Sequence, residues 1–135
     1  MIRVRKIDHL VLRSNNVPAM VRFYREVLGC EVERELPPEV GLTQLRAGDA
    51  LIDLVAVDSE LGRAGGGPPG PADNNLDHVC LELEDTGEKE LRAWLKSQGV
   101  DCGEFETRYG AGGFVSSIYI KDPAGNTVEL RPGHP

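Results

Sequence analysis

The chain repeats one sequence pattern, and this repeat limits its fold more than any other feature. An Asp-His pair opens a strand-like run at Asp8–Leu12 and again at Asp77–Leu81. A shift of about 70 residues relates the two runs and also aligns a following helix and its end. Further aligned pairs are Val21 with Leu91, Tyr24 with Trp94, Gly29 with Gly99 and Glu31 with Asp101. The chain is therefore predicted to consist of two copies of one module.

The first copy predicts a β-α-β-β-β module. Residues 7–13 are predicted to form a strand. Asn16 and Pro18 are typical of a helix start and Gly29 of a helix end, so a helix is expected over residues 18–28. Strands are expected at 31–35, 42–46 and 50–57.

The second copy repeats this order. Asp85 or Thr86 is expected to cap a helix that ends at Gly99. One face of this helix is expected to carry Leu91, Trp94 and Leu95. Strands are expected near Phe105 and at 115–120 and 127–131.

Residues 61–75 are predicted to form a linker, because Gly65–Pro71 has too many glycines and prolines for a regular helix or ladder. Module one then covers residues 1–60 and module two residues 76–135 of one domain. The predicted fold class is α+β. The strands of the two tandem modules are expected to curve into one mixed-sheet half-barrel, with a cleft inside and the helices outside.

Composition excludes several classes of partner. The formal net charge of −7 disfavours nucleic acid and anionic membranes, because both reward clustered lysine and arginine. No run approaches the roughly 20 apolar residues that a membrane span needs. The three cysteines show no Cys-x-x-Cys spacing and follow no apolar signal segment, which indicates a reducing cytoplasm. A small-molecule partner is expected.

Strand alternation predicts the direction of the polar side chains. In the first strand, Leu10 and Leu12 share the apolar face, so His9 lies on the opposite face. The same alternation assigns His78 and Glu129 to the polar face of their strands. All three candidate ligands therefore avoid the face that packs on a helix.

These polar residues predict a metal site. If the strands form one half-barrel, the cleft gathers His9, His78 and Glu129, and also Asp53, which the repeat aligns with Glu129. Imidazole and carboxylate together suit divalent zinc, nickel, manganese or iron. For Asp53, a solvated strand carboxylate is an equally good interpretation.

The chain resembles the vicinal oxygen chelate superfamily, which includes glyoxalase I, extradiol dioxygenases, fosfomycin-resistance enzymes and bleomycin-resistance proteins. The resemblance rests on the Asp-His pairs, on Phe23–Gly29 and on Asp122–Glu129, and it covers nearly the whole chain. It implies paired β-α-β-β-β modules and a divalent metal held by His9, His78 and Glu129. An oxygen-bearing substrate would chelate the metal through its remaining coordination positions.

Two residues connect the chain to glyoxalase I in particular. Similar enzymes place a glutamate ligand at the position of Asp53, whose carboxylate is one methylene shorter and would reach the metal directly or through water. They also place an arginine that binds a carboxylate of glutathione where Arg13 lies, four residues after His9. A glutathione or other thiol adduct is thus a candidate substrate, although the solvated edge of a sheet also holds arginines without function.

Further cleft residues are predicted in the second copy. Ser117 and Tyr119 are candidate substrate contacts if Ile118 and Ile120 pack inward. Arg108 is expected in a glycine-rich loop that closes over a ligand or simply connects a hairpin. Cys80 shares the face of His78 but is expected to be a small buried hydrophobe.

The resemblance and the residues together favour a lactoylglutathione-lyase-like activity. A divalent metal with open positions stabilises the enediolate that forms when a neighbouring proton is removed. Glu129 or Asp53 would be the catalytic proton shuttle. A homodimer is also expected, with the site within one chain or between two.

Two alternatives stay open. His9, His78 and Glu129 also form the facial triad of an iron-dependent extradiol dioxygenase, but such enzymes usually need another histidine, and only His134 in the tail remains. A metal-free protein that binds a drug or metabolite is the third hypothesis. Fosfomycin-type thiol transfer ranks lower, because the loops of the second module show no cluster of Lys and Arg.

Overall fold

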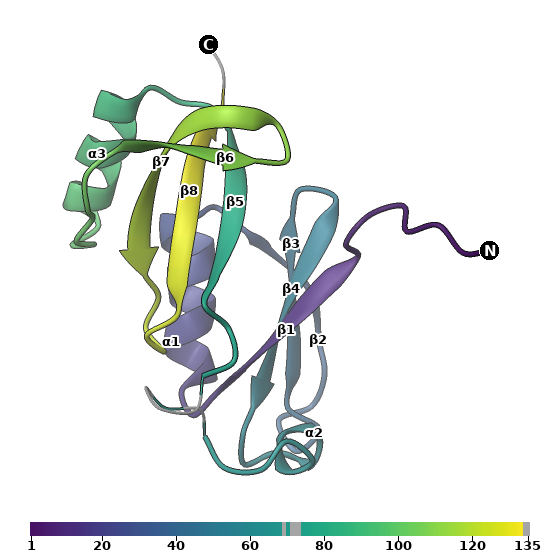
Figure 1. Ribbon diagram of the computed structural model, residues 1–135. Helices are drawn as coiled ribbons and strands as arrows, with labels where there is room; N and C mark the ends of the chain where they lie inside the picture. The colour runs from purple at the N-terminus through teal and green to yellow at the C-terminus, as the bar shows by residue number, and fades with distance from the viewer. Residues whose placement is uncertain (69, 71–73, 134–135) are drawn as a thin grey trace. The chain divides into compact units, whose positions relative to one another are not determined.

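The computed structural model describes residues 1–68, 70 and 74–133 (Figure 1). Its internal contacts divide the chain into two compact units, Met1–Asp73 and Asn74–Pro135. Each unit has one four-stranded sheet, in the order β1-β4-β3-β2 in the first and β5-β8-β7-β6 in the second. The predicted α+β class is confirmed, with one β-α-β-β-β module in each unit. None of the described helices is long and apolar enough to cross a membrane.

The first unit begins with a strand and a two-part helix. The Asn16 side chain accepts a hydrogen bond from the Ala19 amide, as predicted for a helix cap. The helix turns π-helical at Phe23 and ends where Gly29 adopts a φ of +73°. The elements are β1 (His9–Ser14), α1 (Val17–Arg22), η1 (Phe23–Val27), β2 (Glu31–Glu35), β3 (Leu42–Ala47), β4 (Ala50–Ala56) and α2 (Glu60–Arg63).

The second unit has the same order but a different helix start. Its elements are β5 (His78–Asp85), α3 (Glu88–Ser97), β6 (Glu106–Gly110), β7 (Gly113–Lys121) and β8 (Thr127–Gly133). Asp85 and Thr86 were wrong as caps, because β5 extends through Asp85 and the cap is Gly87, without a side-chain hydrogen bond. Gly99 does end the helix, with a φ of +70°. Leu91 and Leu95 are buried, whereas Trp94 lies on the flank of that face and is half exposed.

A short helix occupies the start of the segment predicted as a linker. Ser59 caps α2 by accepting a hydrogen bond from the Gly62 amide, and Gly62 is buried against the end of β4. Residues 69 and 71–73 of the segment lie outside the described part of the chain, as does His134.

The strand register is the same in the two sheets and places the carboxylates. β1 runs parallel to β4 with Val11 opposite Asp53, and β5 runs parallel to β8 with Cys80 opposite Glu129. On the other side of each carboxylate strand, Gln44 of β3 lies opposite Asp53 and Tyr119 of β7 opposite Glu129. The opposite faces form the apolar cores. Fully buried core side chains are Met20, Tyr24, Leu45, Ile52 and Leu54 in the first unit and Leu95, Ile118, Val128 and Leu130 in the second.

Candidate functional site

Each predicted histidine ligand is oriented by the aspartate before it. His9 Nδ1 lies 2.8 Å from Asp8 Oδ2, and His78 Nδ1 lies 2.7 Å from Asp77 Oδ2. An ionised carboxylate only accepts hydrogen bonds, so Nδ1–H donates, and in the neutral imidazole Nε2 keeps its lone pair. Metal-binding histidines usually have this carboxylate partner. The repeated Asp-His pair therefore has a physical role in both units.

In the first unit, Asp53 is buried and held by an amide. Its exposed fraction is 4%. Gln44 Nε2 lies 3.2 Å from both carboxylate oxygens and donates to them, while Gln44 Oε1 accepts a 2.8 Å hydrogen bond from Arg34 Nε. The Arg34 bond fixes which end of the amide faces Asp53. Asp53 is thus an oriented strand carboxylate rather than a freely solvated one.

In the second unit, the imidazole and the carboxylate lie side by side. His78 Nε2 is 3.3 Å from Glu129 Oε1, and Glu129 is 5% exposed. The ring of Tyr119 meets the His78 ring edge to face, with centroids 5.6 Å apart. Burial, and then the charge of Glu129, raise the pKa of the Tyr119 phenol, which keeps it protonated as a hydrogen-bond donor at neutral pH.

Arg108 lies on β6, so its assignment to a glycine-rich loop was wrong. The pairing of β6 with β7 continues to Gly110 and Gly113, because these glycines allow a tight hairpin. Arg108 Nη1 donates to Ser117 O at 2.7 Å and to Ser117 Oγ at 3.0 Å. Its guanidinium lies 4.3 Å from the centroid of the Tyr119 ring. Arg108, Ser117 and Tyr119 are therefore one connected group on the face that carries Glu129.

Arg13 contacts the glycine-rich segment that follows α2. Its Nη2 donates to Gly62 O at 3.1 Å, Gly66 O at 2.5 Å and Gly67 O at 3.1 Å. Its Nε is buried and has no hydrogen-bond partner among the described residues. The guanidinium is therefore engaged by main-chain carbonyls where sequence analysis expected a substrate carboxylate.

Cys80 is exposed, so the expectation of a small buried hydrophobe was wrong. Burial of its sulfur region and the neighbouring charge of Glu129 raise the pKa of the thiol to about 11. A thiol with this pKa stays protonated at neutral pH, and the thiolate is the form that binds metals and attacks electrophiles. Cys80 is therefore a neutral thiol rather than a thiolate nucleophile at neutral pH.

The donors occur as one pair in each unit. Throughout residues 1–68, 70 and 74–133, no three His, Cys, Asp or Glu side chains gather as a metal-binding group. His78 and Glu129 form the pair of the second unit. In the first unit, the hydrogen bond to Asp8, and then the charge of Asp53, raise the pKa of the His9 imidazole. Histidine and carboxylate in each pair fit the donor chemistry of a divalent ion.

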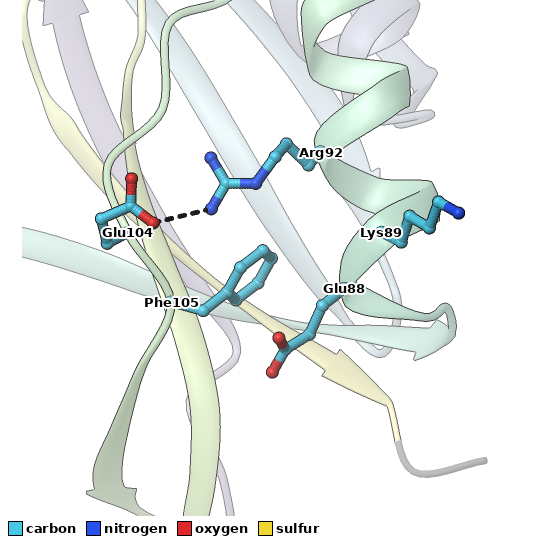
Figure 2. Close-up of a pocket in the computed structure, with 5 residues that line it drawn as sticks. All are labelled: Glu88, Lys89, Arg92, Glu104 and Phe105. Atoms are coloured by element: carbon cyan, nitrogen blue, oxygen red, sulfur yellow. Dashed lines mark hydrogen bonds and ion pairs between the residues drawn. The ribbon is translucent and has the colours of Figure 1, made fainter.

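A cavity of about 490 Å³ lies elsewhere in the second unit, between α3 and the segment before β6 (Figure 2). It is lined by Glu88, Lys89, Arg92, Glu104 and Phe105. Arg92 reaches from α3 across the Phe105 ring, 5.3 Å from its centroid, to Glu104 Oε2 at 3.3 Å. None of the predicted site residues lines this cavity. The Arg92–Glu104 ion pair connects α3 to the segment that precedes β6.

The hydrogen bond that His9 donates to Asp8 gives a testable pH effect. This bond is the largest cause of the raised pKa of His9, followed by the charge of Asp53. Asp8→Asn is expected to lower the pKa of His9 and so to move protonation of the imidazole to lower pH. An NMR titration of the His9 ring proton measures the shift, and Asp49→Asn is the control. Equal His9 pKa values in all three proteins would contradict the assignment.

Comparison with known proteins identifies the family. The model of the Glyoxalase/Bleomycin resistance protein/Dioxygenase superfamily matches residues 6–130. The chain belongs to this superfamily. The resemblance that was inferred from the Asp-His pairs and from Asp122–Glu129 is therefore confirmed.

Two similar proteins and one solved structure show what the chain resembles. Biphenyl-2,3-diol 1,2-dioxygenase 3 of Rhodococcus globerulus is 33% identical over 131 residues, which cover 93% of this chain but only 62% of the dioxygenase. Virulence protein STM3117 of Salmonella typhimurium is 32% identical over 127 residues, which cover 93% of this chain and 82% of that protein. The crystal structure of lactoylglutathione lyase from Agrobacterium tumefaciens has a TM-score of 0.71 and 26% identity, covering 97% of this chain and 96% of the lyase.

Two polar residues of this glyoxalase-superfamily chain were missed as site residues by sequence analysis. Gln44 was inconspicuous, because only the register shows that it lies opposite Asp53. Arg131 follows Glu129 by two residues, and strand alternation does place both on one face. Its burial, at 6% exposure, is a property of the folded hairpin and has no sequence signal.

Proposed function

We propose that this chain is a divalent-metal-dependent enzyme whose ligands are His9, His78 and Glu129, with Asp53 as a fourth donor, directly or through water. The observation that carries the proposal is the His78–Glu129 pair, in which Nε2 and Oε1 are 3.3 Å apart while Asp77 holds Nδ1. The same Asp-His arrangement at His9 supports a second histidine ligand from the first unit. Zinc, nickel, manganese and iron all suit these donors.

The chemistry proposed is proton transfer next to a chelated oxygen. A bound divalent ion polarises adjacent substrate oxygens and lowers the cost of developing negative charge. Glu129 is the residue that accepts and returns the proton, because it is buried and adjoins both His78 and Tyr119. Asp53, held by Gln44, is the second candidate for this role.

The substrate proposed is a small oxygen-chelating molecule, first of all a glutathione or other thiol adduct in a lactoylglutathione-lyase-like reaction. The similarity to the Agrobacterium tumefaciens lyase supports this choice. Arg108 and Arg13 are the candidate contacts for substrate carboxylates, with Ser117 and Tyr119 beside Arg108. Arg13 would have to exchange the Gly62 and Gly66 carbonyls for such a carboxylate.

A second candidate function is ring cleavage by an iron-dependent dioxygenase. The 33% identity to the Rhodococcus globerulus dioxygenase favours it, although this chain spans 62% of that protein. Two histidines and one carboxylate are the facial triad of non-haem iron oxygenases. The protonated Tyr119 phenol beside His78 would supply a proton donor in place of a further histidine.

The test is a metal titration of the untagged protein followed by two assays. Calorimetry with zinc, nickel, manganese and anaerobic ferrous ion is expected to show one tight site per chain. We also propose that the protein is a homodimer. Sedimentation velocity on the same samples tests the dimer. Hemithioacetal turnover with the preferred metal supports the lyase, and catechol cleavage with iron supports the dioxygenase. No binding of any of these ions would leave a metal-free ligand-binding protein.

A further inference from the structure

Arg131 is a buried cation that pairs with no carboxylate in the described part of the chain. It lies on β8, is 6% exposed, and forms no ion pair with any described residue. Its Nη2 donates instead to Gly113 O at 2.7 Å and to Arg108 O at 3.4 Å. A buried charge is costly unless hydrogen bonds compensate for lost water, so these two bonds to the β6–β7 hairpin decide where the guanidinium lies.

The β6–β7 hairpin packs closely on this guanidinium at Gly110. A Cβ atom added to Gly110 would be 1.8 Å from Arg131 Nη1 and 2.7 Å from Cζ. The guanidinium therefore fills the space that any side chain at position 110 would need. Gly112, two residues further along the same hairpin, has no atom within 4 Å of an added Cβ. The close approach is thus specific to Gly110.

Arg108 connects Arg131 to the candidate site. The Arg108 carbonyl accepts from Arg131, while the Arg108 side chain donates to Ser117 and lies over the Tyr119 ring. Tyr119 in turn lies opposite Glu129 in the sheet and against His78. One chain of contacts thus connects a buried arginine on β8 to the only cation that touches Tyr119 among the described residues.

We propose that Arg131 is a positioning residue that holds the β6–β7 hairpin on the sheet, so that the guanidinium of Arg108 lies over Tyr119 beside the His78–Glu129 pair. Arg131 itself touches neither substrate nor metal in this role. The consequence for an anionic substrate rests on the proposed function, because it requires Arg108 to bind substrate. The placement of Arg108 over Tyr119 does not depend on the proposed function.

The experiment compares two disruptions of one contact by NMR on the full chain without metal. The readout is the set of nuclear Overhauser effects between the Arg108 side chain and the Tyr119 ring. Arg131→Met removes the hydrogen bonds, and Gly110→Ala displaces the guanidinium. Both variants are expected to weaken these effects without abolishing them, whereas the control Gly112→Ala keeps them at full intensity. Arg131→Lys, which retains a donor of the right charge, is expected to restore part of their intensity.

The double variant separates positioning from general damage. Without the guanidinium, the space beside position 110 is free, so Gly110→Ala in the Arg131→Met background is expected to add no further change. Unaltered effects in folded Arg131→Met, or a further loss in the double variant, would overturn the proposal. If Arg131→Met does not fold, Gly110→Ala and Arg131→Lys decide it alone. If the protein binds no metal, the proposed function is wrong, but the role of Arg131 in positioning Arg108 is unaffected.

Discussion

Replacing His78 by alanine is expected to weaken divalent metal binding at least about 100-fold, because it removes a direct ligand, and loss of an outer-shell partner alone typically costs about 10- to 100-fold. Of the proposed ligands, His78 is the one that contacts both a second proposed ligand and an orienting aspartate within one unit. Its Nε2 adjoins Glu129 and its Nδ1 is held by Asp77. Without the imidazole, the carboxylate of Glu129 is left as the sole proposed donor of the second unit.

Matched variants make this expectation specific. Glu129→Gln keeps the shape of the side chain but removes its charge, and a comparable loss is expected. Glu82→Gln is its control, because Glu82 is an exposed carboxylate on the next strand, β5. Asp77→Asn is expected to give the smaller, outer-shell loss of about 10- to 100-fold. Calorimetric titration measures all four variants, and an unchanged affinity of His78→Ala would show that the ion binds elsewhere.

The sequence predicted those features that depend on local geometry. Gly29 and Gly99 end their helices because each adopts the left-handed conformation that glycine tolerates best. Ile118 and Ile120 are buried while Tyr119 faces the other way, since successive strand residues alternate between faces. The direction of each candidate ligand could be predicted for the same reason.

Features that depend on contacts between distant segments could not be predicted. Arg108 was expected in a loop, because the glycines after it are as typical of a loop as of a tight hairpin. The partners of Arg13 are main-chain carbonyls from residues about 50 positions later in the chain. Every residue has such a carbonyl, so the sequence does not show which ones Arg13 contacts. Gln44 acquires its role only through the register that sets it opposite Asp53. In each case, tertiary packing decides between local alternatives of similar energy.

Gly62→Ala is expected to destabilise the protein by about 3 kcal/mol, a cost at the upper end of those measured for overpacking. An added Cβ would lie 1.8 Å from Ala56 O and 2.6 Å from Val57 Cα, both main-chain atoms at the end of β4. These atoms cannot move aside as a flexible side chain would. The Ala56 carbonyl also accepts hydrogen bonds from the Ser59 hydroxyl and amide, so a shift there would break the cap of α2.

The sign of this effect makes the experiment decisive. Alanine favours a helix over glycine by about 1 kcal/mol, so a free α2 would gain stability from the substitution. Gly67→Ala is the control, because an added Cβ there meets no atom within 4 Å and its φ is not left-handed. Urea denaturation of both variants is expected to show a large fall in midpoint for Gly62→Ala and almost none for Gly67→Ala. A stabilised Gly62→Ala would mean that α2 does not pack on β4 and that residues 61–75 behave as the linker that their composition predicts.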